Sequence, residues 1–244
     1  MNKINLLTNN NIQKEHLNKS FSKKISLNFI KVFKEIKKDI NTNNKTISVL
    51  NKKFNFSFKI EDLRKFKKFK TIVLIGMGGS ILGAEAINCF LENKIKKKIY
   101  FFNDLDNKKV LNIKKKKNFN KILFLIISKS GHTIETISNF FALDIIKKNS
   151  KNIILISEKK NNLLFSLAKK YNLFYVEHKN YIGGRYAVLS EVGIIPAYLM
   201  GLNIIKLRKN ILKHLVNRKK LFLKDSVIKL ANLLNFKKIN NLIF

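Results

Sequence analysis

Short apolar runs alternate with amphipathic stretches from residue 71 onward, and this alternation constrains the fold more than any other feature. The runs at 71–76, 97–103, 121–128, 152–158 and 173–178 have the length and β-branched content of buried strands. The stretches between them, at 80–93, 108–117, 133–148 and 162–170, have helical spacing. Strands that alternate with helices form parallel sheets through right-handed crossovers. The pattern therefore predicts an α/β fold, with a doubly wound parallel sheet between two helical layers.

Helical periodicity also flanks this central region. Apolar residues recur at helical spacing over 20–40, whereas residues 1–20 are polar and rich in Asn, so we expect that end to be frayed. After a loop at 179–188, helices are predicted over 191–200, 204–222 and 226–236, and the last residues, 239–244, look like the start of another strand. We divide the chain into a helical and polar extension (1–44), the α/β domain (45–201) and a helical linker (202–244).

The composition excludes several classes of protein. Hydrophobic residues make up 45% of the 244, enough for a sizeable core, which argues against general disorder. The longest apolar runs are too short to span a bilayer, and the first residues lack the apolar segment of a secretory signal. A single cysteine, Cys89, permits no internal disulfide and fits a reducing compartment; we expect it on the apolar side of its helix. The sequence thus predicts a cytoplasmic protein without a membrane segment.

The formal net charge of +35 would ordinarily suggest a nucleic-acid partner. Sequence-specific readers of nucleic acid rely on Arg for bidentate contacts, yet only four of the 50 basic residues are Arg. The Lys excess accompanies an excess of Asn, Ile and Phe, as codon usage rich in A and T would produce. We interpret the lysines as a solvated surface without a specific nucleic-acid partner. Such a surface still attracts anionic metabolites.

All nine glycines lie between residues 76 and 201, and they mark three segments. The first, Gly76-Met77-Gly78-Gly79-Ser80, follows a predicted strand and leads into a helix. Such a turn exposes backbone N–H groups beside a helix N-terminus and binds anions, phosphate above all. We expect Ser80 at the N-cap, either as a ligand or as a plain cap. This motif alone also permits a dinucleotide site, because Asp104 lies near the expected position of the acidic residue.

The second segment, Ser128-Lys129-Ser130-Gly131-His132-Thr133, also follows a buried strand and opens a helix. Ser128, Ser130 and Thr133 place three hydroxyls beside the ammonium of Lys129. Hydroxyls, free amides and a cation together suit a phosphate monoester. The alternative is that Ser130 or Thr133 only caps the helix.

The third segment is Gly183-Gly184-Arg185. Two glycines allow a sharp bend, which would bring Arg185 close to a bound ligand. Arg185 stands out because the chain otherwise uses Lys, so a forked or permanent charge is indicated there. The alternative for Arg185 is a structural ion pair.

Together the three segments resemble the glucose-6-phosphate isomerase (phosphoglucose isomerase) family. VLIGMGGSILGAEA resembles its first glycine loop, and SKSGHTIET its phosphate loop, in a form common to sugar isomerase (SIS) domains. IGGRYAVLSEVGIIPAYLMG resembles the family's own signature and is the most specific of the three. The resemblance covers residues 45–236 and implies an SIS-type sheet.

The resemblance also implies an activity and roles for residues. The family interconverts glucose 6-phosphate and fructose 6-phosphate in the cytoplasm, without metal or organic cofactor. By resemblance, Arg185 stabilises the enediolate intermediate. The remaining site residues would bind the substrate and its phosphate: Gly79, Ser80, Ser128, Lys129, Ser130, Thr133 and Gly184.

The sequence departs from the family's pattern where proton transfer is concerned. The family has two SIS domains, and its general base is a Glu of the second, whose motif is absent here. Glu135 and Glu191 are not promoted to that role, and His16, His132, His178 and His214 are read as structural or surface residues. We therefore expect a truncated or split isomerase that lacks the second SIS domain. A second copy, or a chain carrying the missing domain, is the expected protein partner.

Two other readings stay open on the sequence alone. One is a non-catalytic module that binds sugar phosphates, and the other is an SIS enzyme acting on a different phosphosugar. Saturable binding without isomerisation would indicate the module. A preference for pentose, heptose or amino-sugar phosphates would indicate the other enzyme.

Overall fold

The computed structural model describes residues 12, 16–116, 118–209, 211–212 and 221–236. These residues belong to two compact units, one formed by Thr42–Asn210 and the other by the segments Met1–Asn41 and Ile211–Phe244. The predicted strand at 239–244 and most of the predicted frayed start fall outside the described residues, as do residues 210 and 213–220 of the linker helix predicted over 204–222.

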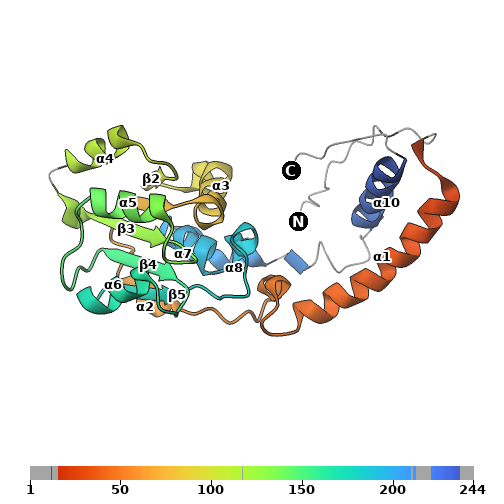
Figure 1. Cartoon of the computed structure of the whole chain (residues 1–244), viewed down its shortest axis with the longest axis horizontal. Helices are drawn as coiled ribbons and strands as arrows, with labels where there is room; N and C mark the ends of the chain where they lie inside the picture. The colour runs from red at the N-terminus through yellow and green to blue at the C-terminus, as the bar shows by residue number, and fades with distance from the viewer. Residues whose placement is uncertain (1–11, 13–15, 117, 210, 213–220, 237–244) are drawn as a thin grey trace. The chain divides into compact units, whose positions relative to one another are not determined.

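The larger unit is built around five parallel strands (Figure 1). In chain order these are β1 (Thr71–Gly76), β2 (Lys98–Phe102), β3 (Ile122–Ile127), β4 (Ile153–Ser157) and β5 (Phe174–Glu177). Their order across the sheet is β2-β1-β3-β4-β5, and every pair is parallel. The chain turns one way from β1 to β2 and the other way from β2 to β3. The switch between directions therefore lies between β1 and β3, which confirms the predicted doubly wound sheet.

Helices cover both faces of the sheet because alternate residues of each strand point to opposite sides. One apolar cluster contains Ile72 and Leu74 of β1, and the other contains Val73 and Ile75. The first face is covered by α2 (Ile60–Arg64), α3 (Leu82–Phe90), α7 (Glu191–Leu199) and α8 (Ile204–Arg208). The second is covered by α4 (Asn107–Lys114), α5 (Ile134–Ala142) and α6 (Leu163–Tyr171). The strands are buried on both faces, which explains their nearly continuous apolar sequences.

Short 3₁₀ helices connect these elements. They are η2 (Thr46–Leu50), η3 (Gly78–Ser80), η4 (Glu92–Lys94), η5 (Phe119–Lys121) and η6 (Gly184–Leu189). The segment predicted as a loop at 179–188 thus contains most of η6. The smaller unit contains α1 (Lys19–Ile40) and α10 (Leu221–Asn235), which pack together; Asn232 accepts a hydrogen bond from the Asn18 backbone N–H at 2.9 Å.

Helices α5 and α3 are among the predicted helices that end earlier than expected. Helix α5 ends at Ala142 rather than at 148, because Asp144 has a φ of 51°, in the left-handed region that interrupts a helix. Helix α3 ends at Phe90 rather than at 93, where the chain changes to η4. Cys89 is therefore exposed in the last turn of α3, and its predicted place on the apolar side is wrong.

Candidate functional site

The carboxyl ends of β1 and β3 place the first two glycine-containing segments side by side. Gly76 at the end of β1 pairs with Ile127 at the end of β3. The loop after β1 contains Gly79 and Ser80, and the loop after β3 contains Ser128 to Thr133. Both loops thus leave the sheet at its switch point, which is where open α/β sheets bind their ligands.

The third segment packs directly on the first. A Cβ atom built on Gly79 would lie 2.2 Å from the backbone carbon of Gly184, so the two backbones touch without intervening side chains. The same 3₁₀ helix η6 inserts Val188 between two further glycines: a Cβ on Gly83 would lie 2.9 Å from Val188 Cβ, and one on Gly193 would lie 2.0 Å from its carbonyl oxygen. These contacts hold the start of η6, and with it Arg185, against the loop that follows β1.

The reason given above for the glycines of the third segment needs correction. Gly183 has an ordinary extended backbone with φ −68° and ψ 148°, and Gly184 starts η6. In the described part of the chain, positive φ occurs among glycines at Gly78, Gly131 and Gly201. A Cβ on Gly184 would meet Gly79 Cα at 3.5 Å and one on Gly183 would meet the Tyr186 ring at 3.4 Å, so the close approach depends on the missing Cβ of Gly79, and no left-handed bend is involved at Gly183 or Gly184.

The second segment forms a cluster of hydroxyls. Ser128 Oγ lies 2.8 Å from Thr133 Oγ1, and Ser130 Oγ lies 3.5 Å from each of them. Ser128 is almost completely buried and also accepts a hydrogen bond from Gly131 N–H at 3.1 Å. Thr133 is the N-cap residue of α5, but its side chain bonds Ser128 and makes no capping bond to the helix. The alternative that Thr133 only caps the helix is therefore excluded.

Backbone amides complete this cluster. The N–H groups of Lys129, Ser130 and Thr133 have no acceptor among the described residues. They lie beside the N-terminus of α5, where the helix dipole favours a negative charge. Free amides and hydroxyls at a helix N-terminus can together bind a phosphate group.

Gly131 fixes the shape of the loop that carries these hydroxyls. Its φ is +71°, and a Cβ there would lie 2.0 Å from Oδ1 of Asn162. Asn162 is buried and donates to the Glu158 carbonyl at 2.7 Å while its Oδ1 accepts from Phe165 N–H at 2.9 Å. The turn after β4 therefore packs against the hydroxyl loop through Asn162, a role that the sequence analysis missed.

Lys129 contributes its backbone to the loop, but its ammonium group is engaged elsewhere. Nζ donates to the carbonyl of Asn180 at 2.6 Å and lies 3.6 Å from Oε1 of Glu158. The structure therefore brings together the three hydroxyls of the second segment and directs the Lys129 charge to the segment after β5.

Among the described residues, the structure gives Ser80 no N-cap role and Arg185 no structural ion pair, although the sequence suggested both. Ser80 ends η3, and the N-cap of α3 is Ile81, so the predicted capping role of Ser80 is wrong. Arg185 is exposed and makes no ion pair or hydrogen bond within the described residues, which contradicts the structural ion pair considered for it. Both side chains are free to contact a ligand.

Arg208 carries a structural role that the sequence analysis missed. Its guanidinium donates to the carbonyls of Leu189, Val49 and Asn51. Burial lowers its pKa, and the nearby Glu191 carboxylate opposes that shift. The scarcity of Arg in this lysine-rich chain could have identified Arg208, since the same argument singled out Arg185.

Glu191 begins α7, directly after η6. It is 1% exposed, and its Oε1 accepts a hydrogen bond from Ser57 N–H at 2.8 Å. Its Oε2 is buried without a partner among the described residues. Desolvation by burial raises its pKa, against hydrogen bonds from its own backbone and Ser57 and the charge of Lys179. A carboxylate so enclosed anchors the segment around Ser57 and is not exposed to a ligand.

Within the described residues, no group of three or more His, Cys, Asp or Glu side chains is placed to hold a metal ion. No helix of that part of the chain is both long and apolar enough to cross a membrane.

The sheet and the paired loops at its switch point define a doubly wound α/β protein, and solved structures share this fold. A hypothetical protein from Thermus thermophilus superposes with a TM-score of 0.65 at 20% identity, covering 89% of this chain and 55% of that one. A glucose-6-phosphate isomerase from Chlamydia trachomatis superposes with a TM-score of 0.54 at 21% identity, covering 71% of this chain and 36% of that one. At these identities the likeness concerns the fold.

The sequence comparisons identify the family. The family model for phosphoglucose isomerase matches residues 3–227, so the chain belongs to the phosphoglucose isomerase family. It is 33% identical over 191 residues to a probable glucose-6-phosphate isomerase of Methanococcus maripaludis, covering 75% of this chain and 42% of the relative. It is 36% identical over 152 residues to the glucose-6-phosphate isomerase of Methanocaldococcus jannaschii, covering 60% and 38%. The chain thus spans about two fifths of the length of these curated relatives.

Proposed function

We propose that this chain supplies the sugar-phosphate site of a cytoplasmic glucose-6-phosphate isomerase, which interconverts glucose 6-phosphate and fructose 6-phosphate through an enediolate. The observation that carries the proposal is the cluster of three hydroxyls and free amides at the N-terminus of α5, beside the switch point of the sheet. Family membership supplies the reaction class. No metal or organic cofactor takes part in the proposed mechanism.

The phosphate of the substrate binds to the second segment. Ser128, Ser130 and Thr133 present hydroxyls that donate to the phosphate oxygens, and the free backbone amides add donors beside the positive end of the α5 dipole. The backbone N–H of Lys129 is one of these amides. Its ammonium approaches the anion only if it leaves Asn180 and Glu158.

The sugar carbons extend toward the junction of the first and third segments. Gly79 and Ser80 line that side, and the absence of a side chain at Gly79 lets its backbone meet that of Gly184 there. Arg185 is exposed at the start of η6 and has no partner among the described residues, so its guanidinium stabilises the negative charge that develops on the enediolate oxygens. Such stabilisation of a developing oxyanion is usually a large catalytic term, on the order of several kcal/mol.

Proton transfer between adjacent carbons needs a carboxylate within reach of both. Glu191 does not fit that role because it is buried and bonded to Ser57. Glu135 lies in the first turn of α5, where a carboxylate favours the helix start. We propose that the base comes from a second SIS domain, and that residues 1–244 alone bind hexose phosphate but turn it over slowly.

A titration with 6-phosphogluconate, a sugar-acid phosphate that resembles the enediolate, tests the phosphate site. We expect saturable binding by the wild type and about tenfold weaker binding by Ser130→Ala, since one charge-assisted hydrogen bond is lost. Ser166→Ala, on the exposed face of α6, is the matched control and leaves the affinity unchanged. If the wild type does not bind 6-phosphogluconate at low salt, the proposed function is wrong.

Arg185→Gln tests the second half of the site in the same titration. Loss of the guanidinium weakens 6-phosphogluconate binding by tenfold or more, because the carboxylate of this ligand stands where the enediolate develops charge. Arg64→Gln removes an equally exposed Arg, which makes only a long 3.8 Å ion pair with Glu61, and leaves the affinity unchanged. Equal effects of the two substitutions would indicate general charge attraction and contradict the role of Arg185.

A further inference from the structure

A polar cavity of about 310 Å³ lies at the same edge of the sheet as the hydroxyl loop but beyond β4 and β5. It is lined by Asn44, the segment Glu158–Lys160 that follows β4, and the segment Glu177–Tyr181 that ends and follows β5. Its volume is at the lower end of the range for small-molecule sites. None of the residue roles proposed above uses this cavity.

The charges around the cavity favour an anion. Glu158 is already neutralised, because Lys129 and Lys160 both form ion pairs with it. Lys159 and Lys179 form no ion pair within the described residues; Lys179 lies 5.8 Å from the centre of the Phe54 ring. Two lysines of the lining are thus available to a ligand, although Lys179 also favours the charged form of the buried Glu191, and the exposed carboxylate of Glu177 opposes them.

Neutral polar groups share the lining with these charges. Asn44 and Asn180 bring amide groups, and Tyr181 brings a phenol whose pKa is raised by burial and by the charge of Glu191, against a hydrogen bond from Ser48. His178 is 2% exposed, and its Nδ1 faces the carbonyl of Lys179 at 3.0 Å. A carbonyl only accepts, so Nδ1 carries the proton and Nε2 of the neutral ring is an acceptor.

The neutral form of His178 is favoured by its surroundings. Burial lowers the pKa of His178 and the charge of Lys129 adds to that effect, whereas the Lys179 carbonyl and Glu158 act in the opposite direction. The lining therefore offers cations for an anionic group, together with amides, a phenol and an imidazole acceptor that suit hydroxyls. A phosphorylated polyol has both kinds of group.

The cavity shares one residue with the hydroxyl loop. The carbonyl of Lys129 accepts from Glu158 N–H at 3.0 Å, and its ammonium donates to Asn180 at 2.6 Å. Lys129 is thus part of the loop through its backbone and adjoins the cavity through its side chain. The two places are neighbours, but their ligand-binding groups are different.

We infer that this cavity is a second anion site, which binds a small phosphomonoester through Lys159 and Lys179 and orients its hydroxyls with Asn180, Tyr181 and His178. The site stands on its own geometry and does not require the proposed isomerase activity. The same cations also suit free phosphate, so the experiment compares the two sources directly.

Histidine imidazole resonances in solution NMR separate the two sites. His178 reports on the cavity, and His132 reports on the hydroxyl loop, where its backbone N–H donates to Ser130 Oγ. We expect glycerol 3-phosphate to shift the His178 resonances saturably at constant ionic strength. Tighter binding of glycerol 3-phosphate than of inorganic phosphate at His178 identifies an organic ester as the ligand, and equal affinities identify free phosphate.

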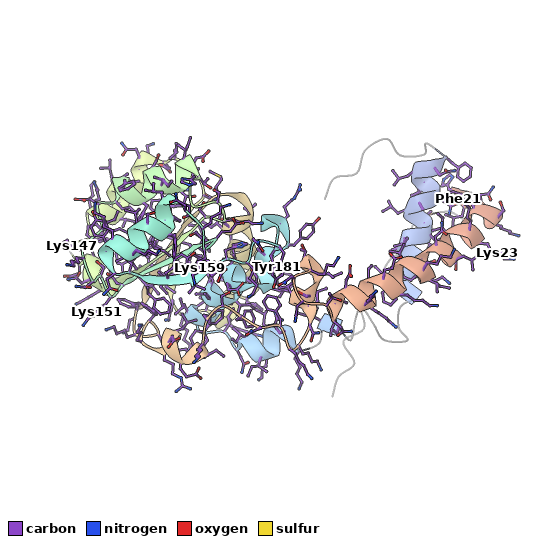
Figure 2. All side chains as sticks on the ribbon, turned by 60° about the horizontal axis from the view of Figure 1, so that its bottom comes forward. Phe21, Lys23, Lys147, Lys151, Lys159 and Tyr181 are labelled. Carbon is purple, nitrogen blue, oxygen red and sulfur yellow. The ribbon has the colours of Figure 1, made fainter. Side chains whose placement is uncertain are left out.

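The double variant Lys159→Gln/Lys179→Gln removes the two available cations without breaking an ion pair, and we expect tenfold or greater weakening at His178 with His132 unaffected. Lys147→Gln/Lys151→Gln is the matched control, because these exposed lysines lie at the opposite end of β4 (Figure 2). The control leaves the His178 affinity unchanged.

Three results would overturn the inference. The first is that neither ligand shifts the His178 resonances. The second is that the control pair of substitutions weakens binding as much as the test pair. The third is that Ser130→Ala abolishes the His178 response together with that of His132. A response at His132 without one at His178 refutes the cavity and leaves the proposed function intact. The reverse result refutes the phosphate loop and supports the cavity.

Discussion

The two halves of the candidate site are built on different physical principles. At the junction of η3 and η6, Gly79 and Gly184 touch backbone to backbone, so the geometry follows from the absence of side chains. In the loop after β3, Ser128, Ser130 and Thr133 touch through hydroxyls that can bond either each other or a ligand. At the junction, steric exclusion fixes the shape of the site. In the loop after β3, hydrogen bonds among the hydroxyls can be replaced by hydrogen bonds to a ligand.

The largest expected effect is on the junction, from Gly79→Ala. The new Cβ would lie 2.2 Å from the Gly184 backbone carbon, and backbone cannot move aside as a flexible side chain can. We expect a loss of about 3 kcal/mol or more in the free energy of unfolding, measured by urea denaturation.

Gly184→Ala is the matched control for this substitution. Its Cβ would meet Gly79 Cα at 3.5 Å, an ordinary van der Waals contact. The stability should therefore stay within about 1 kcal/mol of the wild type. If the two substitutions cost the same, close approach at Gly79 is not what shapes the junction.

An intermediate effect is expected in the hydroxyl loop, from Ser128→Ala. Ser128 is buried, and its loss leaves Gly131 N–H and Thr133 Oγ1 with fewer partners, so we expect the unfolding free energy to fall by about 1–3 kcal/mol. Ser130 is exposed, its contacts with the other two hydroxyls are at 3.5 Å, and its Oγ accepts from His132 N–H at 3.2 Å, so Ser130→Ala should change stability by less than about 0.5 kcal/mol while weakening ligand binding. Equal stability losses would mean that the hydroxyls form one rigid structural cluster and would blur the contrast with the junction.

The smallest effect concerns Glu191, the ionisable group next to the junction. Its pKa is raised in the folded protein by burial, so the folded state binds a proton more tightly than the unfolded state. Stability should therefore fall as the pH rises from the ordinary Glu value through the raised one. Glu191→Gln removes this slope, which denaturation at several pH values measures. The assignment would be contradicted if the stability of the wild type rose with pH in this window and the variant showed the same pH dependence.

The strands were predictable because each is buried on both faces. Residues 72–75 and 122–127 are uninterrupted apolar runs, and β1 and β3 contain them almost to the residue. The helix ends were harder, since Ile145 and Ile146 continue the helical spacing although Asp144 has left the helix. Ile145 is still buried, so its apolar character reflects core packing rather than helix.

The candidate site was predictable where residue type alone carries the signal. Three hydroxyls within six residues after a buried strand could be recognised without a structure. Asn162 could not, because its contact with Gly131 depends on the positions of two loops in space. The direction of the Lys129 side chain likewise depends on Asn180, which is 51 residues away in the sequence.

The guanidinium of Arg208 has a practical consequence for the design of shorter fragments of this chain. It joins a carbonyl at the end of η6 to two carbonyls beside η2, so residues from three distant parts of the sequence meet on one side chain. A fragment that stopped at the end of α7 would leave those carbonyls without their donor and the η6 segment without its tether. The smallest piece that preserves the junction should therefore run through α8.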